Sequence, residues 1–370
     1  MSDQRGFFDL DERYAALSKA GDPLERLSAV VDFELFRPEF DAALNRSDGS
    51  RGGRPPMDPV LMFKVLVLQA LHGLSDAQAE FQILDRRTFG RFLGIGDGDT
   101  VPDETTIWRF REALVRAGAV ERLFARFDAH PGSAGYLAMR GQVIYASIVA
   151  APRQRMTEAE REIVKGGGIP EDWKARPKKL AQKGEPWVAI GSRRMANDAR
   201  WTLRRGRRKR RADGTLMEAI ATPVFGYKSR INIDRRHGLI RKWTVSDAAR
   251  HDGRELAGLL DRTNTASSVW ADTACRSRKN EKRIAGAGLV SKIHFRRAPG
   301  KALAPQHQRA NAARSKVRSA VEHPFAEQKS RMGLFVRTIG IARAKAKIGM
   351  ANIAFNMKRL VFLERGRLAA

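Results

Sequence analysis

Asp272 is the first residue whose type and position could do chemistry. It follows a short apolar run, Ser267 to Ala271, that has the pattern of a buried strand. Open α/β sheets hold their ligands beyond the carboxyl ends of the strands, so a carboxylate at this point is a candidate catalytic group. The same carboxylate could instead cap the helical segment that is expected to start at Thr273. The residue alone leaves both interpretations open.

A second group of candidates lies on a helix predicted near the carboxyl end. Arg318, Glu322 and Lys329 are spaced by four and seven residues, which places them on one face of a helix. Glu322, with a cation on either side, is a candidate metal ligand with phosphate-binding neighbours. A row of surface ion pairs, which is common on helices, is the alternative. Pro324 lacks an amide proton and is predicted to kink this helix near Glu322.

The segments around these residues predict an α/β domain. Residues 141–150, GQVIYASIVA, are rich in β-branched residues and bounded by turn residues, which indicates a strand with Tyr145 and Ser147 on one face. The other predicted strands are a hairpin at 222–234 and 239–246 and single strands at 267–271 and 289–295, and the helices are at 252–262, 276–285, 309–331 and 342–366. This order predicts a mixed sheet flanked by helices, within a domain at 141–366.

Charge is distributed unevenly along the 370 residues, whose formal net charge is +28. Residues 1–140 hold 18 Lys and Arg against 22 Asp and Glu, whereas residues 141–370 hold 51 against 19. A field of this sign attracts polyanions, and each neutralised phosphate of a nucleic acid releases counterions. The concentration of charge in one half predicts a nucleic-acid partner rather than a generally basic surface.

The amino-terminal part is predicted to be all helical. Residues 1–46 form a peripheral helical segment, a linker rich in Gly, Pro and Ser follows, and residues 57–135 form a helical domain of the DNA-binding kind. The helices around the turn at 94–101 resemble a helix-turn-helix, whose second helix enters the major groove. In that interpretation the DNA contacts are Thr105, Thr106, Arg109 and Arg111. An ordinary helical bundle with solvated arginines is the alternative.

The densest basic run lies within a long polar insertion predicted at about 152–221. Seven of the eight residues in RRGRRKRR are basic. Like charges at this density repel one another unless a polyanion is present, so a loop that contacts DNA phosphates is favoured over a merely solvated loop. The predicted contacts are Arg204, Arg205, Arg207, Arg208, Lys209, Arg210 and Arg211.

Several classes of protein do not fit the sequence. No apolar run reaches the ~18 residues that a membrane-spanning helix needs, so no membrane partner is expected. The amino-terminal segment lacks the basic-then-apolar layout of a signal peptide. Cys275 is the single cysteine, which rules out an internal disulfide and a zinc site built on cysteines. We therefore expect a cytoplasmic protein associated with the nucleoid.

Several strings, taken in order, resemble the DDE transposases of bacterial insertion sequences, specifically the insertion-sequence-five group. PMDPVLMFKVLVLQALHGLSD is similar to the helical amino-terminal region of that family. PDETTIWRFRE and LFARFDAHPGSAGYLAMRGQVI resemble the approach to its catalytic domain. VWADTACRS, KVRSAVEHPFAEQK and GLFVRTIGIARAKAKIGMANIAFNMKRL resemble its carboxyl-terminal half. Each string is weakly specific, but together they cover nearly the whole chain.

The resemblance implies a ribonuclease H-like fold in which two aspartates and one glutamate hold a pair of Mg²⁺ ions. Asp272 matches the second aspartate and Glu322 matches the glutamate. The family's helix signature, Tyr-x2-Arg-x3-Glu-x6-Lys, is matched at Arg318, Glu322 and Lys329, with Ser315 in place of the tyrosine. These matches imply that Asp272 and Glu322 are metal ligands and that the two cations steady phosphates.

The family's first aspartate is replaced by Tyr145, in GQVIYASIVAAP. A phenol has a pKa of ~10 and is neutral at pH 7, so it cannot bridge two hard cations as a carboxylate does. We predict a DNA transposase that acts on double-stranded element ends and target DNA as a homodimer, by metal-dependent phosphodiester cleavage and strand transfer, with activity impaired in this copy. A catalytically inactive DNA-binding relic or regulator of related elements is the alternative. Other carboxylates that could replace the missing ligand are Asp198, Asp234, Asp247 and Asp252.

Overall fold

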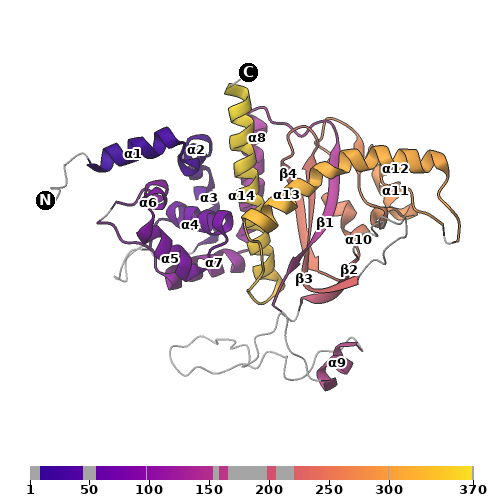
Figure 1. Ribbon diagram of the computed structural model, residues 1–370, viewed down its shortest axis with the longest axis horizontal. Coiled ribbons are helices and arrows are strands. Elements are labelled where there is room, and N and C mark those ends of the chain that lie inside the picture. The colour runs from indigo at the N-terminus through magenta and orange to yellow at the C-terminus, as the bar shows by residue number, and fades with distance from the viewer. Residues whose placement is uncertain are drawn as a thin grey trace, which may run out of the picture.

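The computed structural model describes residues 9–44, 56–96, 98–152, 158–165, 198–205, 221–298 and 300–368 (Figure 1). Its α-helices are α1 (Asp9–Ala20), α2 (Pro23–Val30), α3 (Arg37–Ala43), α4 (Pro59–His72), α5 (Asp76–Asp85), α6 (Arg87–Leu93), α7 (Glu104–Arg116), α8 (Ala119–Ser133), α9 (Glu158–Lys165), α10 (Asp252–Leu259), α11 (Arg278–Gly286), α12 (Pro305–Arg318), α13 (Glu322–Ala326) and α14 (Ile341–Leu368). Shorter helical turns are η1 (Phe33–Phe36), η3 (Thr273–Cys275), η4 (Ser319–Val321) and η5 (Glu327–Arg331). The strands are β1 (Gln142–Ala150), β2 (Arg200–Arg205), β3 (Ala221–Asp234), β4 (Ile240–Asp247), β5 (Ser268–Trp270) and β6 (Val290–Ser291).

The strands of the described residues form one mixed sheet. Five of them follow the order β2-β3-β1-β5-β6, and β4 pairs with β3. The β1, β2, β3 and β4 pairings are antiparallel, whereas β5 runs parallel to both β1 and β6. The predicted mixed α/β class with a helical amino-terminal region is therefore confirmed, including the hairpin formed by β3 and β4.

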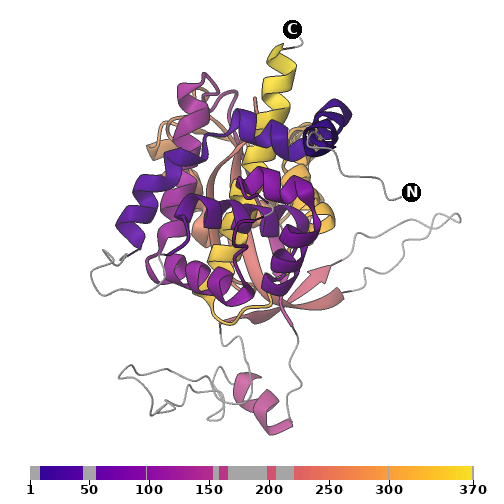
Figure 2. The ribbon, with the colours of Figure 1, turned by 90° about the vertical axis from the view of Figure 1, so that its left-hand side faces the viewer.

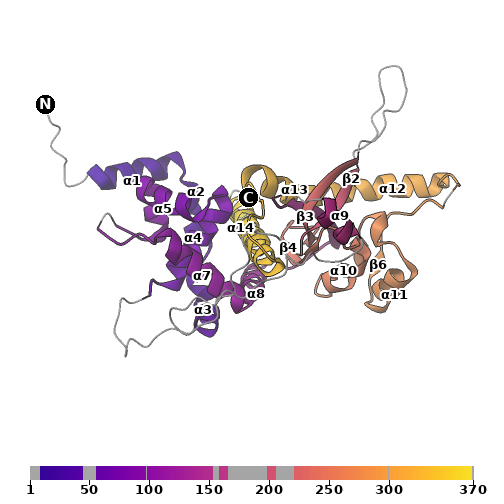
Figure 3. The same cartoon turned by 90° about the horizontal axis from the view of Figure 1, so that it is seen from below.

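The two faces of the sheet are covered by different helices, because side chains alternate along each strand. On β1, Val143 and Val149 pack into the apolar cluster that includes α8 and α14, whereas Ile144 packs into a second cluster with Leu256 and Leu259 of α10. Figures 1 and 3 show α8 and α14 between the sheet and the amino-terminal helices, with α10 and α11 beyond the sheet. The alternation predicted for this strand is confirmed.

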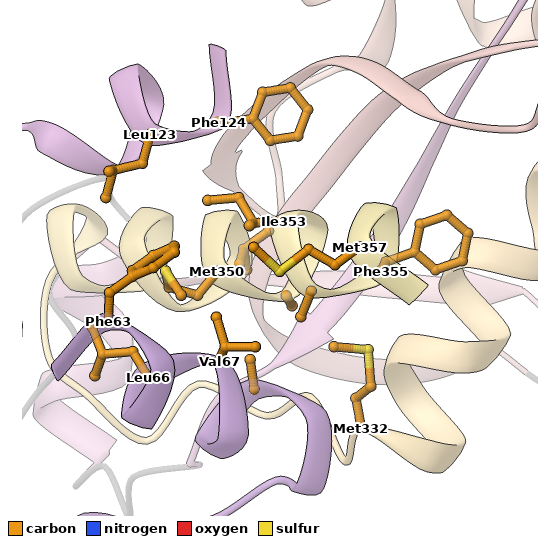
Figure 4. Close-up of a cluster of buried hydrophobic side chains, with 14 of the residues drawn as sticks. Phe63, Leu66, Val67, Leu123, Phe124, Met332, Met350, Ile353, Phe355 and Met357 are labelled. Carbon is orange, nitrogen blue, oxygen red and sulfur yellow. The ribbon is translucent and has the colours of Figure 1, made fainter. Parts of the chain in front are cut away.

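The carboxyl-terminal helix α14 joins both ends of the chain into one core. Phe63, Leu66 and Val67 of α4 lie on one side of it, and Leu123 and Phe124 of α8 lie on another (Figure 4). The same cluster of buried residues continues into β1 and β3. Figure 2 shows the amino-terminal helices stacked in front of the sheet with α14 between them. Each large apolar side chain buried in this way contributes about 1.5–3 kcal/mol, so most of the fold depends on this junction.

The sharp turn between α4 and α5 is set by local chemistry. Asp58 caps α4 by accepting from the backbone N–H groups of Val60 and Leu61, and Gly73 ends the helix with a φ of 68°. A Cβ at Gly73 would lie 2.9 Å from the carbonyl oxygen of Met332, so only glycine fits this approach. Among the described residues no single helix has the length and hydropathy to cross a membrane; α4 and α5 meet that test only jointly, across a bend of 101°.

The prediction of one continuous helix at 309–331 is wrong. This segment is divided into α12, the 3₁₀ turn η4, the short α13 and the π-turn η5. Pro324 donates no backbone hydrogen bond and its ring conflicts with the preceding turn, which accounts for the tightened turn just before it. The helix type therefore changes near Glu322, and the predicted kink there stays a prediction.

The strand β2 lies inside the segment predicted as a polar insertion. It pairs antiparallel with β3, with Arg204 opposite Thr222 and Arg205 opposite Ala221. The prediction of a loop at these two arginines is therefore wrong, because the backbone of β3 supplies hydrogen-bond partners that the local charge pattern does not reveal. The predicted contacts from Arg207 to Arg211 lie outside the described residues.

A buried ion pair fastens α7 to α14. The guanidinium of Arg343 donates to both carboxylate oxygens of Glu112, at 2.7–3.0 Å, and the Glu112 side chain is 6% exposed. Replacing Arg343 by Met is expected to lower the free energy of unfolding by about 2–3 kcal/mol, because a buried carboxylate loses its partner. Urea unfolding followed by circular dichroism measures the change. The control Arg37→Met, at a solvent-exposed ion pair, should cost less than about 1 kcal/mol; equal losses would contradict the argument.

Candidate functional site

Tyr145 lies on β1, and Asp272 follows the neighbouring parallel strand β5 by two residues. β1 and β5 pair with Val143 opposite Trp270. Carried two residues further along both strands, this register brings Asp272 abreast of Tyr145. Asp272 also caps η3, since its Oδ1 accepts from the backbone N–H of Thr273 at 2.6 Å. The capping interpretation and the site interpretation are therefore compatible, because the second carboxylate oxygen takes no part in the cap.

Arg318, at the end of α12, stands between these two residues. Its guanidinium carbon is 5.0 Å from the centre of the Tyr145 ring, within range of a cation–π interaction. Its Nη1 is 4.0 Å from Oδ2 of Asp272. The Arg318 side chain is only 17% exposed, and its buried Nε has no hydrogen-bond partner in the described part of the chain. A fixed positive charge of the protein itself thus adjoins both side chains.

Glu322 follows Arg318 by one 3₁₀ turn and begins α13. Its side chain is exposed, and no hydrogen bond or ion pair to it is present among the described residues. Phe325, three residues further on, packs against Tyr145 with ring centres 6.1 Å apart. Glu322 therefore lies in the chain between two residues that both contact Tyr145, with its carboxylate open to solvent.

Lys329, in the π-turn η5, reaches the same strand. Its Nζ donates to Oγ of Ser147 at 2.5 Å. Ser147 is two residues beyond Tyr145 and so lies on the same face of β1. The structure thus brings Tyr145, Asp272, Arg318 and Lys329 together along one stretch of β1 and the end of β5.

Ser315, in the position of the family's tyrosine, is held by His294. The serine Oγ is 2.9 Å from Nε2 of the imidazole, and Nδ1 lies 3.2 Å from the carbonyl oxygen of Ala271. Because Ala271 precedes Asp272, His294 links the end of β5 to the helix that carries Arg318. This contact positions the helix; it offers no phenol at this point.

Two further arginines extend the positive charge and were not among the predicted site residues. Arg276 and Arg314 both donate to the carbonyl oxygen of Ile293, at 2.8 and 2.6 Å, and both guanidinium carbons lie 4.3 Å from the Phe295 ring centre. Burial, with the adjacent charge of Arg276, lowers the pKa of Arg314. Arg314 is one helical turn before Arg318, so the spacing Arg-x3-Arg in α12 was the available sequence signal.

The four carboxylates considered as replacements for the missing metal ligand all accept hydrogen bonds from groups outside the site. Each of the four carboxylates accepts a hydrogen bond from a group outside the site: Asp198 from the backbone of Ile341, Asp234 from the Arg241 guanidinium, Asp247 from the backbone of Arg250, and Asp252 from the Arg230 guanidinium. None of these contacts leads to Tyr145. We therefore do not propose that any of them replaces the missing aspartate.

The predicted DNA contacts on α7 divide into two kinds. Arg109 and Thr105 are exposed. Thr106 serves the start of the helix, since its N–H and its hydroxyl both donate to Asp103. The guanidinium of Arg111 is half-buried and donates to both carboxylate oxygens of Asp76, at 2.5 and 2.8 Å, so its role as a DNA contact stays a prediction.

The donor set around Tyr145 does not fit a site for two magnesium ions. Within the described ranges no three His, Cys, Asp or Glu side chains gather where they could hold a metal ion. Tyr145 presents a phenol rather than a carboxylate, and the guanidinium of Arg318 lies between its ring and the Asp272 carboxylate. Since Mg²⁺ prefers charged oxygen ligands in octahedral order, this arrangement disfavours it.

Two protein families match the chain. Residues 12–113 match a family described as Transposase domain (DUF772), and residues 201–357 match the Transposase DDE domain. No solved structure matches it. Both matched regions are transposase domains, which supports a DNA transposase. The second match is more particular and supports a DDE-type transposase, from a family of nucleases and transposition enzymes that generally use divalent metal ions.

Proposed function

We propose that this protein binds the ends of a DNA insertion element and is impaired in cutting them. The DDE family match and the charge of the carboxyl-terminal half support DNA as the partner. The mixed sheet, with Asp272 just beyond a central strand, supports assignment to the ribonuclease H-like folds. The matched strings support membership of the insertion-sequence-five group, and we propose a homodimer on double-stranded DNA.

The observation that carries the proposal is the position of Arg318. Its guanidinium lies against the Tyr145 ring and 4.0 Å from the Asp272 carboxylate, where the family places carboxylate-bound cations. A fixed guanidinium can pair with a phosphate oxygen but cannot activate a water for attack. The site is therefore suited to holding a phosphodiester and poorly suited to breaking it.

The basic side chains of the site have separate tasks in this proposal. Arg318 and Lys329 steady the phosphate nearest Tyr145. Arg276 and Arg314, whose guanidinium groups converge beside Phe295, hold the adjoining DNA backbone. Phosphate contacts of this kind fix the register of a protein on DNA without reading its sequence. Recognition of the element ends is assigned to the amino-terminal helices, with Arg109 and Thr105 as the exposed candidates.

A non-catalytic regulator of related elements is the second candidate function. The presence of Tyr145 in place of an aspartate favours this candidate, because it removes a metal ligand needed for cutting but leaves the DNA-binding groups in place. A protein that binds element ends without cutting them would block active transposases from those ends. The two candidates make the same prediction for DNA binding and differ only in cleavage.

DNA binding is expected to be strongly salt-dependent and to persist in EDTA. If 6–10 phosphates are contacted, affinity should fall about 10³- to 10⁵-fold between 50 and 200 mM salt, measured by fluorescence anisotropy on a labelled duplex. The double variant Arg276→Met with Arg314→Met should reduce the slope of log affinity against log salt by about 1–2. Arg13→Met, an exposed arginine of the acidic half, is the matched control and should leave the slope unchanged. A salt-insensitive affinity would overturn the proposed interface.

A further inference from the structure

A cavity of about 200 Å³ lies where the amino-terminal helices meet the carboxyl-terminal segment. One wall comes from α4, α5 and α7, and the other from residues 333–350. Most of the lining is apolar, including Leu66, Leu114 and Met350. Much of the first wall lies within the region matched by one family, residues 12–113, and the second lies within the region matched by the other, residues 201–357, so an occupant of the cavity would contact both.

Four cationic side chains line this apolar cavity, and two of them are neutralised. Arg111 is paired with Asp76 and Arg343 with Glu112, each through two or more hydrogen bonds. Asp76 also accepts from the side-chain amide of Gln69 at 2.7 Å. Asp76, the carboxylate that lines the cavity, therefore directs its hydrogen bonds to Arg111 and Gln69.

The other two cations, Lys347 and Arg337, form no ion pair in the described part of the chain, although Asp76 is close enough to Lys347 to affect it electrostatically. Arg337 is exposed and stacks on the Phe335 ring at 5.7 Å. The ammonium of Lys347 makes no hydrogen bond or ion pair there. Burial, together with the charges of Arg111 and Arg337, lowers the pKa of Lys347, and the charge of Asp76 only partly opposes this shift. Thr338 lines the same cavity, and its buried hydroxyl also lacks a hydrogen-bond partner in this part of the chain.

We propose that this cavity binds a phosphate monoester dianion. Lys347 offers three N–H donors, Thr338 an O–H donor and Arg337 a planar fork, and a phosphate group presents several oxygens to accept them. Two cations that form no ion pair match a dianion, and the apolar walls suit an organic group attached to it. The dianion can come from a small molecule or from the 5′ end of a DNA strand, and both present the same chemistry to these residues.

Binding at this point would strengthen the junction between the helical region and the sheet domain. A ligand that binds only the folded protein adds to its stability in proportion to the logarithm of its concentration over Kd. It would also remove a cost, because Lys347 is now desolvated without a partner. The site thus offers a means by which a phosphorylated ligand could control how firmly the helical region is held.

Thermal unfolding of the full chain tests this proposal. Inorganic phosphate and phenyl phosphate, titrated at constant ionic strength against NaCl, should raise the Tm, with phenyl phosphate binding more tightly. Lys347→Met should raise the Tm in the absence of phosphate, because a desolvated charge is removed, and should weaken binding about 10- to 100-fold. Lys345→Met, on the same helix but outside this cavity, is the control and should keep the response of the unmodified chain.

The outcomes separate cleanly. An equal response of Lys347→Met and the unmodified chain to every phosphate probe, or no response of either to any probe, the 5′-phosphorylated oligonucleotide included, overturns the proposal. A 5′-phosphorylated oligonucleotide that stabilises the chain through Lys347, where its 5′-hydroxyl counterpart and the small phosphates do not, identifies a DNA end as the source. A response to the small phosphates identifies a small ligand. The measurement of Tm needs no DNA cleavage and no divalent ion, so its result does not depend on whether Tyr145 impairs cleavage.

Discussion

Replacing Tyr145 by Asp is expected to give divalent-metal-dependent nicking of element-end DNA where the unmodified chain gives none. The substitution places a carboxylate on β1, where Arg318 contacts both this position and Asp272 and where Phe325, three residues after Glu322, packs. Metal ions held in this way contribute several kcal/mol of transition-state stabilisation, so a gain of about 10³-fold over background is expected. A labelled duplex carrying the element end, resolved on a denaturing gel with and without Mg²⁺, measures it.

Two controls distinguish restored ligation from a general change in the site. Tyr145→Phe keeps the ring under Arg318 and should stay inactive, and Tyr145→Asp combined with Asp272→Asn should lose the gain. A Mn²⁺-dependent rise in Tm, seen only with Tyr145→Asp, reports the ion independently of cutting. Cleavage by the unmodified chain at the rate of the variant would show that another group supplies the missing ligand. A Tyr145→Asp variant that binds the ion without cutting would show that other residues of the site also prevent cleavage.

The second large effect is expected at Asp234, at the turn between β3 and β4. Its fully buried carboxylate accepts from the backbone N–H of His237 at 2.7 Å and from Nε of Arg241 at 3.1 Å. Asp234→Ala should lower the free energy of unfolding by about 3–5 kcal/mol, since it leaves a buried guanidinium short of a partner and backbone donors unsatisfied. Chemical denaturation followed by tryptophan fluorescence measures the loss.

The exposed Asp41→Ala provides the reference for this prediction and should change stability by no more than about 0.5 kcal/mol. A loss below about 1 kcal/mol at Asp234 would mean that Arg241 is satisfied by its other contacts, with Asp128 at 3.0 Å and the Tyr136 carbonyl at 2.6 Å. Such a result would also make Asp234 a candidate again for the missing metal ligand.

Local patterns predicted the elements whose periodicity is strong. The strand containing Tyr145 and the β3–β4 hairpin were predictable because β-branched alternation and a turn bound them closely. The strand β2 was not, because arginines rarely signal strands and its partner strand begins some twenty residues later in a region of mixed charge. The helix at 309–331 was overextended because periodicity continues through Pro324 while the backbone hydrogen bonds do not.

The candidate site was predictable in its residue types and not in its geometry. Asp272, Arg318 and Lys329 could be chosen from spacing and resemblance, and the structure places them along β1 and β5. That Arg318 lies against Tyr145 depends on how α12 packs on the sheet, which no local pattern encodes. The pairing of Arg111 with Asp76, and of Arg343 with Glu112 more than two hundred residues away, equally requires tertiary structure. The predicted division into separate domains stays a prediction.

The position of α14 has a consequence for how the chain folds during synthesis. Helices α4 and α8 are translated early, but α14, which covers their apolar faces, is translated more than two hundred residues after α8, which ends at Ser133, whereas α14 begins at Ile341. At about 5–20 residues per second, those faces remain uncovered for roughly tens of seconds. A nascent chain with such surface exposed is a substrate for chaperones and for aggregation, so the yield of this protein should depend on translation speed and chaperone supply more than its final stability suggests.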